Sequence, residues 1–391
     1  MTSRIISLEF TPVSVPYTHR ERSSQVERDG VSDVVVKAST DDGLTGWGES
    51  CSGADIHSVL EALQAMEAFV LGRSPWESER IRADLWHRGL WNFRKGTGAF
   101  AYAGIDMALW DLCGKISGQP LYHRLGGAVR EQATYFYYLA WDHAAGLTNQ
   151  CQDGLSRGYT VFYLKVGKDI VAEREMVAAV RTAIGPKCRL RLDANGAWTV
   201  AEALRNLASL SRFDIDFIEQ PVAPDPVTNM CEVRQRSGVP VCANEGLWTV
   251  EDAYRQISNR TADVYCFSPY WVGSLVQFQR LAQVAAYEGM QVCKHTHGEL
   301  GIAAAACHHV LMTLPNIVEG NQQTAQMMRE DVLKQPLPIA GNPVWGLPDG
   351  PGLGVEVDAA KLALGYDNFR RHRQYLPYGA AAPHRLGEVS L

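Results

Sequence analysis

The sequence has no long apolar segment and no strong charge of either sign, and both absences narrow its function. It contains no run of about 18 apolar residues, the length that a membrane-spanning helix needs. The 43 acidic and 37 basic residues give a formal charge of −6. Because this balance is mild and mixed, we expect neither a nucleic-acid partner nor a membrane partner. The N-terminus alternates instead of forming a leader, so we expect a cytoplasmic protein.

Paired cysteine motifs and glycine-rich phosphate loops are also missing. The nine cysteines are scattered, odd in number and form no CxxC pair. This pattern argues against a disulfide framework or a zinc site and favours reduced, buried thiols. No GxGxxG motif follows a strand, which argues against a doubly wound nucleotide-binding sheet. The length of 391 residues leaves room for about two to three domains.

The N-terminal third contains strands followed by helices. Residues 4–15 and 32–40 alternate like β-strands, with a turn expected at Asp42-Gly43. The polar stretch between them, 16–30, is too long for a tight hairpin, so we expect a loop that is a functional flap or mobile. From 57 to 118, apolar residues recur at helical spacing.

From residue 132 onward, strand-like runs that end in a polar residue alternate with helical segments. The ends recur every 23 to 28 residues, about the length of one βα unit. Seven or eight successive units predict a closed parallel barrel, with a doubly wound sheet as the alternative. In a barrel, the carboxyl ends of the strands open into one mouth, where active sites lie. The first strand is expected at 134–140, and the following strands end at Lys165, Asp193, Glu219, Glu245, Ser268, His295 and Glu319.

Three consecutive strand ends carry carboxylates, namely Asp193, Glu219 and Glu245. Neighbouring strands lie about 4.8 Å apart, so the three acids would repel one another and raise one another's pKa. A hard divalent cation relieves this repulsion, and an all-oxygen ligand set suits Mg²⁺. We therefore predict a Mg²⁺ site here; the simpler alternative is three unrelated acids near loops.

Candidate proton-transfer groups end the strands on either side of the acids. Tyr163 and Lys165 lie two residues apart and share a strand face; Lys165 is either a partly desolvated base or a salt-bridged lysine. His295 and His297 also share a face and could move a proton or shape the pocket. Glu319 is expected to bind a substrate carboxylate or to donate a proton.

The order of these strand ends resembles the enolase superfamily, in its mandelate racemase and muconate-lactonizing branch. Three further segments are similar to that branch: GWGE at 46–49, IDMALWDLCGK at 105–115 and PDGPGLGVEVD at 348–358. The residues that carry the main resemblance are Lys165, Asp193 (LDAN), Glu219 (IEQP), Glu245 (ANEG) and His295.

This resemblance implies an α/β fold: a modified TIM barrel under a discontinuous α+β capping domain. The expected division is a capping domain at 1–131, a barrel at 132–335 and a segment at 336–391 that returns to the capping domain. It also implies Mg²⁺ on the three carboxylates and removal of the proton α to a substrate carboxylate, giving a metal-stabilised enediolate. Subunits of this family usually pair, so we expect a homo-oligomer built from dimers, possibly up to an octamer.

Three positions depart from the family pattern. Tyr163 stands where the first lysine of a lysine-x-lysine motif is common, and Asn244 stands where an aspartate usually precedes the third ligand. Ser268 replaces either a lysine or the aspartate that supports a catalytic histidine. The missing lysine argues against the two-lysine epimerases. The missing aspartate leaves His295 without its usual orienting partner, which makes Lys165 the preferred base.

We therefore predict a Mg²⁺-dependent dehydratase of a sugar acid or related hydroxy acid, whose substrate is a small carboxylate. Lys165 would remove the α-proton, and His295 or Tyr163 would assist departure of the β-hydroxyl. The alternatives are a cycloisomerase, a racemase or epimerase, or a non-catalytic ligand-binding protein on the same fold. Further substrate contacts are expected from Asn195, His297, Glu319 and, in the polar stretch 16–30, Arg20.

Overall fold

A computed structural model describes residues 3–51, 55–89 and 92–376. The N-terminal part is an antiparallel sheet of order β1-β2-β3, made of β1 (Ile5–Arg22), β2 (Glu27–Thr40) and β3 (Thr45–Ser50). The helices α1 (Ile56–Val70), α2 (Ser78–Arg88) and α3 (Thr97–Ser117) follow it, with the 3₁₀ turn η1 (Pro75–Glu77) between the first two. We call β1–β3 and α1–α3 the capping domain.

The stretch 16–30 forms the end of a long hairpin, so the prediction of a loop in place of a hairpin is wrong, while its role as a functional flap stays a prediction. β1 continues to Arg22 and β2 begins at Glu27, with Glu21 paired opposite Arg28 after a register shift. The charged residues Glu21 and Arg28 are buried. A strand whose buried side is charged does not show the usual alternation of apolar and polar residues, and this is why the pattern predicts a loop.

Helix α3 is the central contact between the capping domain and the barrel. It packs on β3 on one side and on the barrel helices α10, α11 and α12 on the other. A Cβ at Gly48 would lie 1.9 Å from the carbonyl oxygen of Gly104 in α3, so only glycine permits this approach. The GWGE segment and the IDMALW helix are therefore two sides of one close contact.

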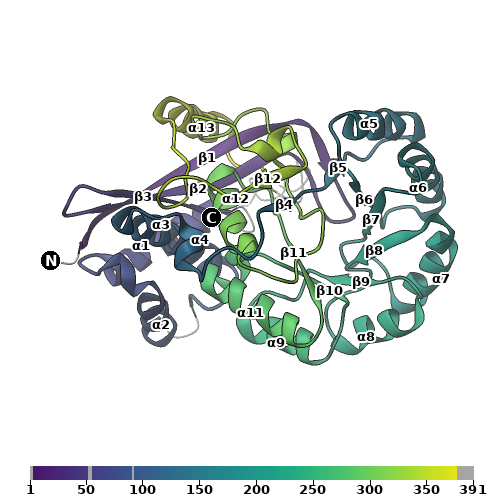
Figure 1. Ribbon diagram of the computed structural model, residues 1–391, viewed down its shortest axis with the longest axis horizontal. Helices are drawn as coiled ribbons and strands as arrows, with labels where there is room; N and C mark the ends of the chain where they lie inside the picture. Colours follow the sequence, from purple (N-terminus) through teal and green to yellow (C-terminus); the bar gives the residue numbers. More distant parts are fainter. Residues whose placement is uncertain (1–2, 52–54, 90–91, 377–391) are drawn as a thin grey trace, which may run out of the picture.

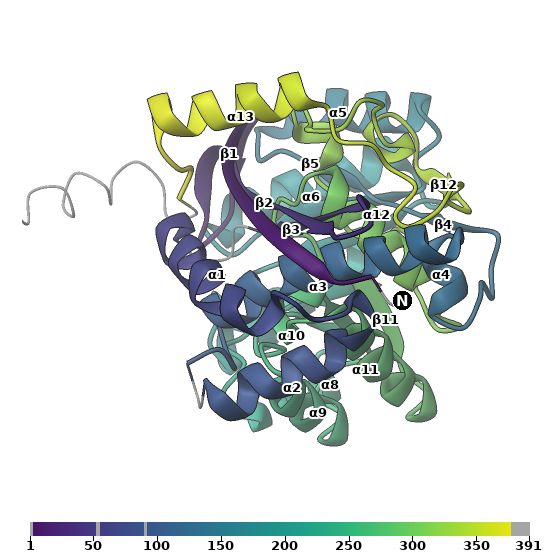
Figure 2. The same cartoon turned by 90° about the vertical axis from the view of Figure 1, so that its left-hand side faces the viewer.

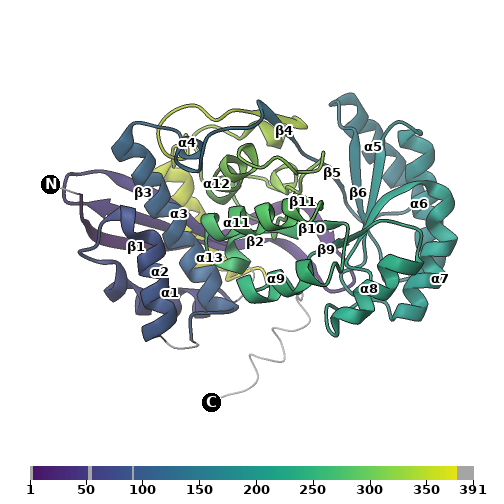
Figure 3. The ribbon, with the colours of Figure 1, turned by 60° about the horizontal axis from the view of Figure 1, so that its bottom comes forward.

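The second part is a parallel barrel, as predicted. Seven strands follow one another in order around it, and helices cover its outer surface (Figures 1 and 3). The strands are β5 (Tyr137–Leu139), β6 (Val161–Lys165), β7 (Arg189–Asp193), β8 (Ile215–Glu219), β9 (Val241–Ala243), β10 (Val264–Phe267) and β11 (Gln291–Lys294). The helices are α5 (Ala144–Ser156), α6 (Ile170–Ile184), α7 (Val200–Leu210), α8 (Val227–Arg236), α9 (Val250–Ser258), α10 (Pro269–Val272), α11 (Leu275–Tyr287) and α12 (Gly301–Met312).

The barrel closes through residues 316–321, which run beside β11 without forming a regular strand. Ile317 bridges to Val292 of β11, and Asn321 bridges to Tyr135 on the other side. The expected first strand at 134–140 is divided into β4 (Gln132–Thr134) and β5. β4 pairs with β12 (Val344–Gly346) of the C-terminal segment instead of with the barrel.

The C-terminal segment returns to the capping domain. Its helix α13 (Ala359–His372) packs along β1 (Figure 2), and the backbone N–H of Tyr375 donates to Ser32 of β2 at 2.8 Å. The predicted boundaries at 131 and 335 stay a prediction, and residues 377–391 of the predicted third segment lie outside the described ranges. The remaining short elements are α4 (Leu121–Arg124), η2 (Ser211–Phe213), η3 (Ala325–Met327) and η4 (Pro338–Ala340).

Two buried carboxylates of the capping domain accept hydrogen bonds from the N-termini of barrel helices. Glu49 accepts from the backbone of Leu300 and Ala303 at 2.7 and 3.0 Å, at the start of α12. Asp106 accepts from the backbone of Leu275 at 2.8 Å, at the start of α11. Helix N-termini leave backbone N–H groups without an intrahelical partner, so these carboxylates join the two parts.

Within the described ranges, no helix has the length and apolar character to cross a bilayer.

Candidate active site

The strand ends bring Lys165, Asp193 and Glu219 to one level of the barrel mouth. Lys165 pairs in register with Asp193, and Asp193 with Glu219, on the neighbouring strands β6, β7 and β8. Glu245 follows two residues after β9. Parallel strands place their carboxyl ends at the same edge, so the regular spacing in the sequence becomes a cluster in space.

The three carboxylates form a strongly acidic, desolvated group. Burial and the nearby charge of Asp193 raise the pKa of Glu219 well above its usual range. The same two causes raise the pKa of Glu245 to about 7. One buried oxygen of Glu245, Oε2, has no hydrogen-bond partner in the described part of the chain. A set of buried carboxylate oxygens, one of them without a hydrogen-bond partner in the described part of the chain, fits a hard divalent cation such as Mg²⁺.

The carboxylates are held by amide side chains. The Nδ2 group of Asn195 donates to Glu245 Oε1 at 2.9 Å, and the backbone N–H of Asn195 donates to Asp193 Oδ1 at 2.7 Å. Gln322 Nε2 donates to Glu219 Oε2 at 2.6 Å. Asn195 therefore lines the cavity and supports two of the expected ligands, while its predicted contact with substrate stays a prediction.

Lys165 is tied to the carboxylates and does not have the depressed pKa that a free base requires. Its Nζ lies 2.5 Å from Asp193 Oδ2 and 3.0 Å from Asn195 Oδ1. Burial acts to lower its pKa, but the charges of Asp193 and Glu219 outweigh burial and raise it. A divalent cation on the carboxylates would offset the charges that keep this amine protonated.

Tyr163 supports Asp193. Its hydroxyl donates to Asp193 Oδ2, and its ring stacks on Phe136 at a centroid distance of 4.5 Å. Burial raises the pKa of Tyr163 well above its usual value, so its hydroxyl keeps its proton. Tyr163 shares a face with Lys165, as predicted, and both line the same cavity.

His295 and His297 line the other wall of that cavity. Their ring centroids lie 5.7 Å apart, and the Trp271 ring packs against His295 at 4.7 Å. Tyr270 Oη lies 3.1 Å from His295 Nδ1. Burial and neighbouring positive charges lower the pKa of His295 well below 6.5 and that of His297 to about 3. Both imidazoles are therefore neutral.

The cavity has a volume of about 330 Å³ and is enclosed by both parts of the protein. The hairpin formed by β1 and β2 supplies Glu21, Gln25, Val26 and Arg28. Arg28 Nε donates to Glu21 at 2.7 Å, and Arg28 Nη2 donates to the carbonyl of His297 at 2.9 Å. The hairpin is therefore fastened to the loop that carries the histidines. The aromatic part of the wall consists of Phe100, Phe136, Tyr138, Tyr163, Trp248 and Trp271.

Two of the predicted substrate contacts lie outside the cavity, and those predictions are wrong. The side chain of Glu319 is 63% exposed and pairs with Arg189 at 3.4 Å. Arg20 is exposed on β1 and pairs with Asp29 at 2.7 Å. Glu319 points outward because residues 316–321 do not form the regular strand on which its orientation was predicted.

Gln322 is the residue that sequence reasoning missed on this segment. It lies 27 residues after His295, which fits the rhythm of the other strand ends better than the 24 residues to Glu319. Arg28 and Glu21 were missed because they belong to the stretch predicted as a loop. Their opposite charges at facing hairpin positions were the available signal.

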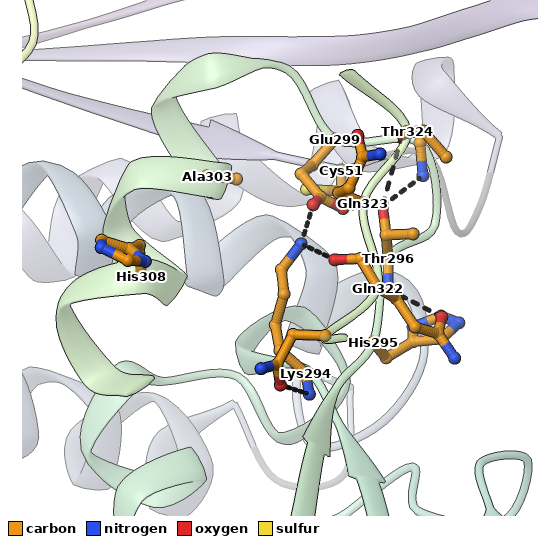
Figure 4. A network of polar contacts seen from close by, with 12 residues as sticks. Cys51, Lys294, His295, Thr296, Glu299, Ala303, His308, Gln322, Gln323 and Thr324 are labelled. Atoms are coloured by element: carbon orange, nitrogen blue, oxygen red, sulfur yellow. Dashed lines mark hydrogen bonds and ion pairs between the residues drawn. The ribbon is translucent and has the colours of Figure 1, made fainter. Parts of the chain in front are cut away.

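A second buried polar cluster, around Lys294 and Glu299, lies next to His295 and holds the surrounding backbone in place (Figure 4). Lys294 points away from the cavity and forms an ion pair with Glu299, and its Nζ also donates to the carbonyl of Gln322 at 3.2 Å. Alternate residues of a strand face opposite sides, so Lys294 holds the outer side of β11 while His295 faces the cavity.

A barrel with three carboxylates on successive strand ends, under a capping domain that closes the mouth, defines an enzyme of the enolase class. The chain belongs to the mandelate racemase and muconate-lactonizing branch of the enolase superfamily. Residues 146–361 match the family described as enolase C-terminal domain-like. Residues 12–126 match the N-terminal domain of mandelate racemase and muconate lactonizing enzyme.

Known relatives in this family catalyse several reactions. The chain is 29% identical over 353 residues to a D-galactarolactone cycloisomerase of Agrobacterium fabrum, covering 87% of this chain and 93% of the relative. It is 27% identical to an L-Ala-D/L-Glu epimerase of Bacillus subtilis, covering 92% and 98%. It is 28% identical to a probable glucarate dehydratase of Streptomyces coelicolor, covering 95% and 92%.

Two solved structures are similar over nearly their whole length. A Mycobacterium smegmatis protein described as an enolase, in complex with tartrate, superposes with a TM-score of 0.89 at 25% identity, covering 99% of this chain and 97% of that chain. A Thermobispora bispora protein described as an enolase, with magnesium and formate, gives 0.88 at 25% identity, covering 98% and 97%.

Proposed function

We propose that the protein is a Mg²⁺-dependent dehydratase of a hydroxylated carboxylic acid, a sugar acid or a close relative of one. The observation that carries this proposal is a single cavity in which Lys165 faces the acidic cluster and a neutral His295 occupies the other wall. This arrangement places one amine, which a cation on the carboxylates would help to deprotonate, and one hydrogen-bond donor on opposite walls of the cavity.

Asp193, Glu219 and Glu245 would hold the cation. When bound, Mg²⁺ would draw charge from the substrate carboxylate and so acidify the neighbouring carbon. Lys165 then removes the α-proton, with Asn195 and Asp193 orienting its Nζ. His295 assists departure of the β-hydroxyl, and the aromatic wall keeps bulk water away from the carbanion.

Several similarities support a hydroxylated acid as the substrate class. Two relatives are named for acids derived from sugars, a galactarolactone cycloisomerase and a probable glucarate dehydratase. The M. smegmatis neighbour holds tartrate, a dicarboxylic acid with two hydroxyl groups. In this chain, Lys95, Arg28 and His297 line the cavity and could bind a second polar end of such an acid.

The second candidate is a cycloisomerase acting through the same proton removal. Ser268 follows β10 at the position where a second lysine would be needed for two-base chemistry, and the galactarolactone cycloisomerase is a relative of this type. One base is enough for ring closure or opening, so a cycloisomerase would use the same residues.

We also propose that the protein is a homo-oligomer, because subunits of this family usually pair.

The test is a panel of sugar acids, tartrates and acid lactones, incubated with the enzyme and Mg²⁺ in deuterated water and followed by proton NMR. A dehydratase releases water and gives a keto acid. A product with the same atoms as its substrate and a new ring would support the cycloisomerase instead. If Glu219→Gln changed neither turnover nor Mg²⁺ binding by calorimetry, the proposed metal site would be wrong.

A further inference from the structure

The environment of His295 defines its role more narrowly than the sequence could. The usual carboxylate partner of such a histidine is replaced by Ser268, whose buried hydroxyl has no hydrogen-bond partner among the residues described. His295 nevertheless has a partner, because Tyr270 of α10 places its Oη 3.1 Å from Nδ1. Tyr270 is fully buried and its ring stacks on Phe100, so the hydroxyl is held in place.

We propose that Tyr270 is a positioning residue that donates its hydroxyl hydrogen to His295 Nδ1, so that the imidazole presents Nε2–H to the substrate. In this state His295 is a hydrogen-bond donor, and Lys165 is the sole base of the site. This inference rests on the proposed function only for its catalytic consequence, because the tautomer of His295 exists whether or not a substrate is bound.

The direction of the hydrogen bond follows from the acceptors available to Tyr270. If Nδ1 carried the proton, the phenol oxygen would accept from it and would need another acceptor for its own hydrogen. Two other groups lie beside the phenol oxygen. The carbonyl of His295, at 3.5 Å, is beyond the usual range for an O–H···O bond, and the Ser268 hydroxyl makes no hydrogen bond of acceptable geometry within the described residues. If the phenol hydroxyl donates to the imidazole nitrogen instead, its hydrogen has an acceptor and no buried donor is left without a partner.

Burial, together with the charges around it, lowers the pKa of His295 and keeps it neutral, as this role requires. Lys294 precedes it on β11, Lys165 faces it from β6 and Arg28 from β2, with His297 beside it; all of these oppose a positive imidazole. A carboxylate partner would favour the imidazolium, whereas a tyrosine hydroxyl adds no charge. Replacing aspartate by a Ser268 and Tyr270 pair therefore changes the residue from a proton carrier into a fixed donor.

This assignment also determines where the proton of a dehydration goes. Lys165 takes the α-proton, and the electron pair of the broken C–H bond stays on the carbanion. That pair then forms the carbon–carbon double bond as the C–O bond to the β-hydroxyl breaks. The resulting ammonium of Lys165 gives that proton to the departing hydroxyl, which forms water and restores the neutral amine. Because one group performs both transfers, hydrogen and hydroxyl leave from the same face of the substrate.

The first experiment reads the tautomer directly, without substrate. Histidine labelled with nitrogen-15 in the full-length protein, at neutral pH, should show His295 with its proton on Nε2; the signals are assigned by their absence in His295→Gln. In Tyr270→Phe, which keeps the ring but loses the hydroxyl, the Nδ1 signal should move. Tyr265→Phe is the matched control. Tyr265 lies in β10, and its hydroxyl donates to the carbonyl of Gln256 and not to His295. A wild-type proton on Nδ1 would overturn the proposal.

The second experiment separates a donor from a base. Glutamine can donate a hydrogen bond from its amide and cannot take up a proton, so His295→Gln should keep kcat within about tenfold of wild type, whereas His295→Ala should lose about 10²–10³-fold. If His295→Gln were as inactive as His295→Ala, His295 would be a proton-transfer group and the proposal would fail. If the tautomer is as stated and no hydroxy acid is turned over, the proposed function fails and the role of Tyr270 stands.

Discussion

At the scale of single residues, the most informative one is Lys165, because its surroundings work against the role that its position suggests. The ammonium lies against Asp193, and the carboxylates raise its pKa. A base must first lose its proton, so the acidic cluster has to be neutralised before Lys165 can act. In the proposed mechanism, proton removal by Lys165 would therefore be coupled to occupancy of the carboxylates by a cation.

Lys165→Ala should abolish the exchange of the α-proton with solvent, lowering its rate about 10²–10⁴-fold, the usual contribution of a positioned base. Deuterium incorporation into the substrate, followed by proton NMR, measures this directly. Lys168→Ala is the control, since Lys168 lies on the loop after β6 and lines a separate surface cleft. Full exchange in Lys165→Ala would assign the base to another residue and leave the fold untouched.

Gln322 permits a test of the metal site that avoids its ligands. Its amide donates to Glu219, so Gln322→Leu should weaken Mg²⁺ binding about 10–100-fold by releasing that carboxylate. Isothermal titration with Mg²⁺ measures the change. Gln279→Leu is the control: Gln279 contacts Leu125 and Thr313 outside the cavity, and Mg²⁺ affinity should be unaltered there. Equal affinities in all three proteins would show that Gln322 does not support a ligand.

At the scale of elements, the contact between α3 and α11 contains a titratable group. Asp106 is fully buried, and burial raises its pKa to about 8. One of its oxygens accepts from Leu275, and the other, Oδ1, has no hydrogen-bond partner within the described ranges. The protonated acid suits this environment, because burying a charged oxygen without a partner costs more than burying a neutral one.

Stability should therefore fall as the pH rises. The unfolded chain has an Asp106 pKa near 3.8, so between about pH 4 and pH 8 the folded state binds the extra proton. Stability is fully present below that window and declines by up to about 1.4 kcal/mol per pH unit within it. Urea unfolding at pH 5 and pH 7.5 measures the change. Asp106→Asn should make this slope shallower by up to the contribution of one proton, because Glu219 and Glu245 also have raised pKa values and keep the rest of it. Glu232→Gln, which replaces an exposed acid in α8, should leave the slope unchanged. An unchanged slope in Asp106→Asn would assign the pH dependence to other groups.

Some elements of the fold can be predicted from the sequence and others cannot. The ends of β6, β7 and β8 are predicted to the residue, because in each strand the last apolar residue is followed directly by a charged one, Lys165, Asp193 or Glu219. The hairpin and the last barrel segment are not predicted. The hairpin buries charges, and the segment at 316–321 closes the barrel by isolated bridges. Pattern reading works where burial follows hydrophobicity and fails where burial is decided by a partner far away in the chain, as for Arg28 and His297.

Electrostatic details were beyond the sequence for a similar reason. The type and position of Lys165 were predicted, but the direction of its pKa shift depends on the balance between burial and two carboxylates at known distances. The partner of His295 was also hidden, because Tyr270 lies on a short helix after β10 and its orientation is a tertiary property. Sequence spacing identified the site, while the protonation states of its residues required coordinates.

At the scale of the whole molecule, the buried pair of Arg28 and Glu21 fastens the hairpin to the barrel. Glu21→Ala leaves the guanidinium buried without its carboxylate, which should cost about 3–5 kcal/mol of hairpin docking. We expect KM to rise more than kcat falls, and cleavage by trypsin near the hairpin to become faster. Removing both charges in Glu21→Gln, Arg28→Met should recover much of the loss. The double variant being worse than Glu21→Ala would mean that the two residues act independently.

The tip of the same hairpin touches the barrel mainly through main-chain atoms. Ser24 donates to the carbonyl of Ala194 at 2.8 Å, and Gln25 donates to the carbonyl of Asn195; these are the two residues that follow the expected metal ligand Asp193. A carbonyl oxygen is present whatever the side chain, so this seat does not depend on the identity of the barrel residues. The hairpin could therefore be exchanged. A hairpin with different cavity-lining residues could dock on the same barrel strand ends. Selectivity for new acids could be engineered by grafting residues 20–29 from a relative while the chemistry below is kept.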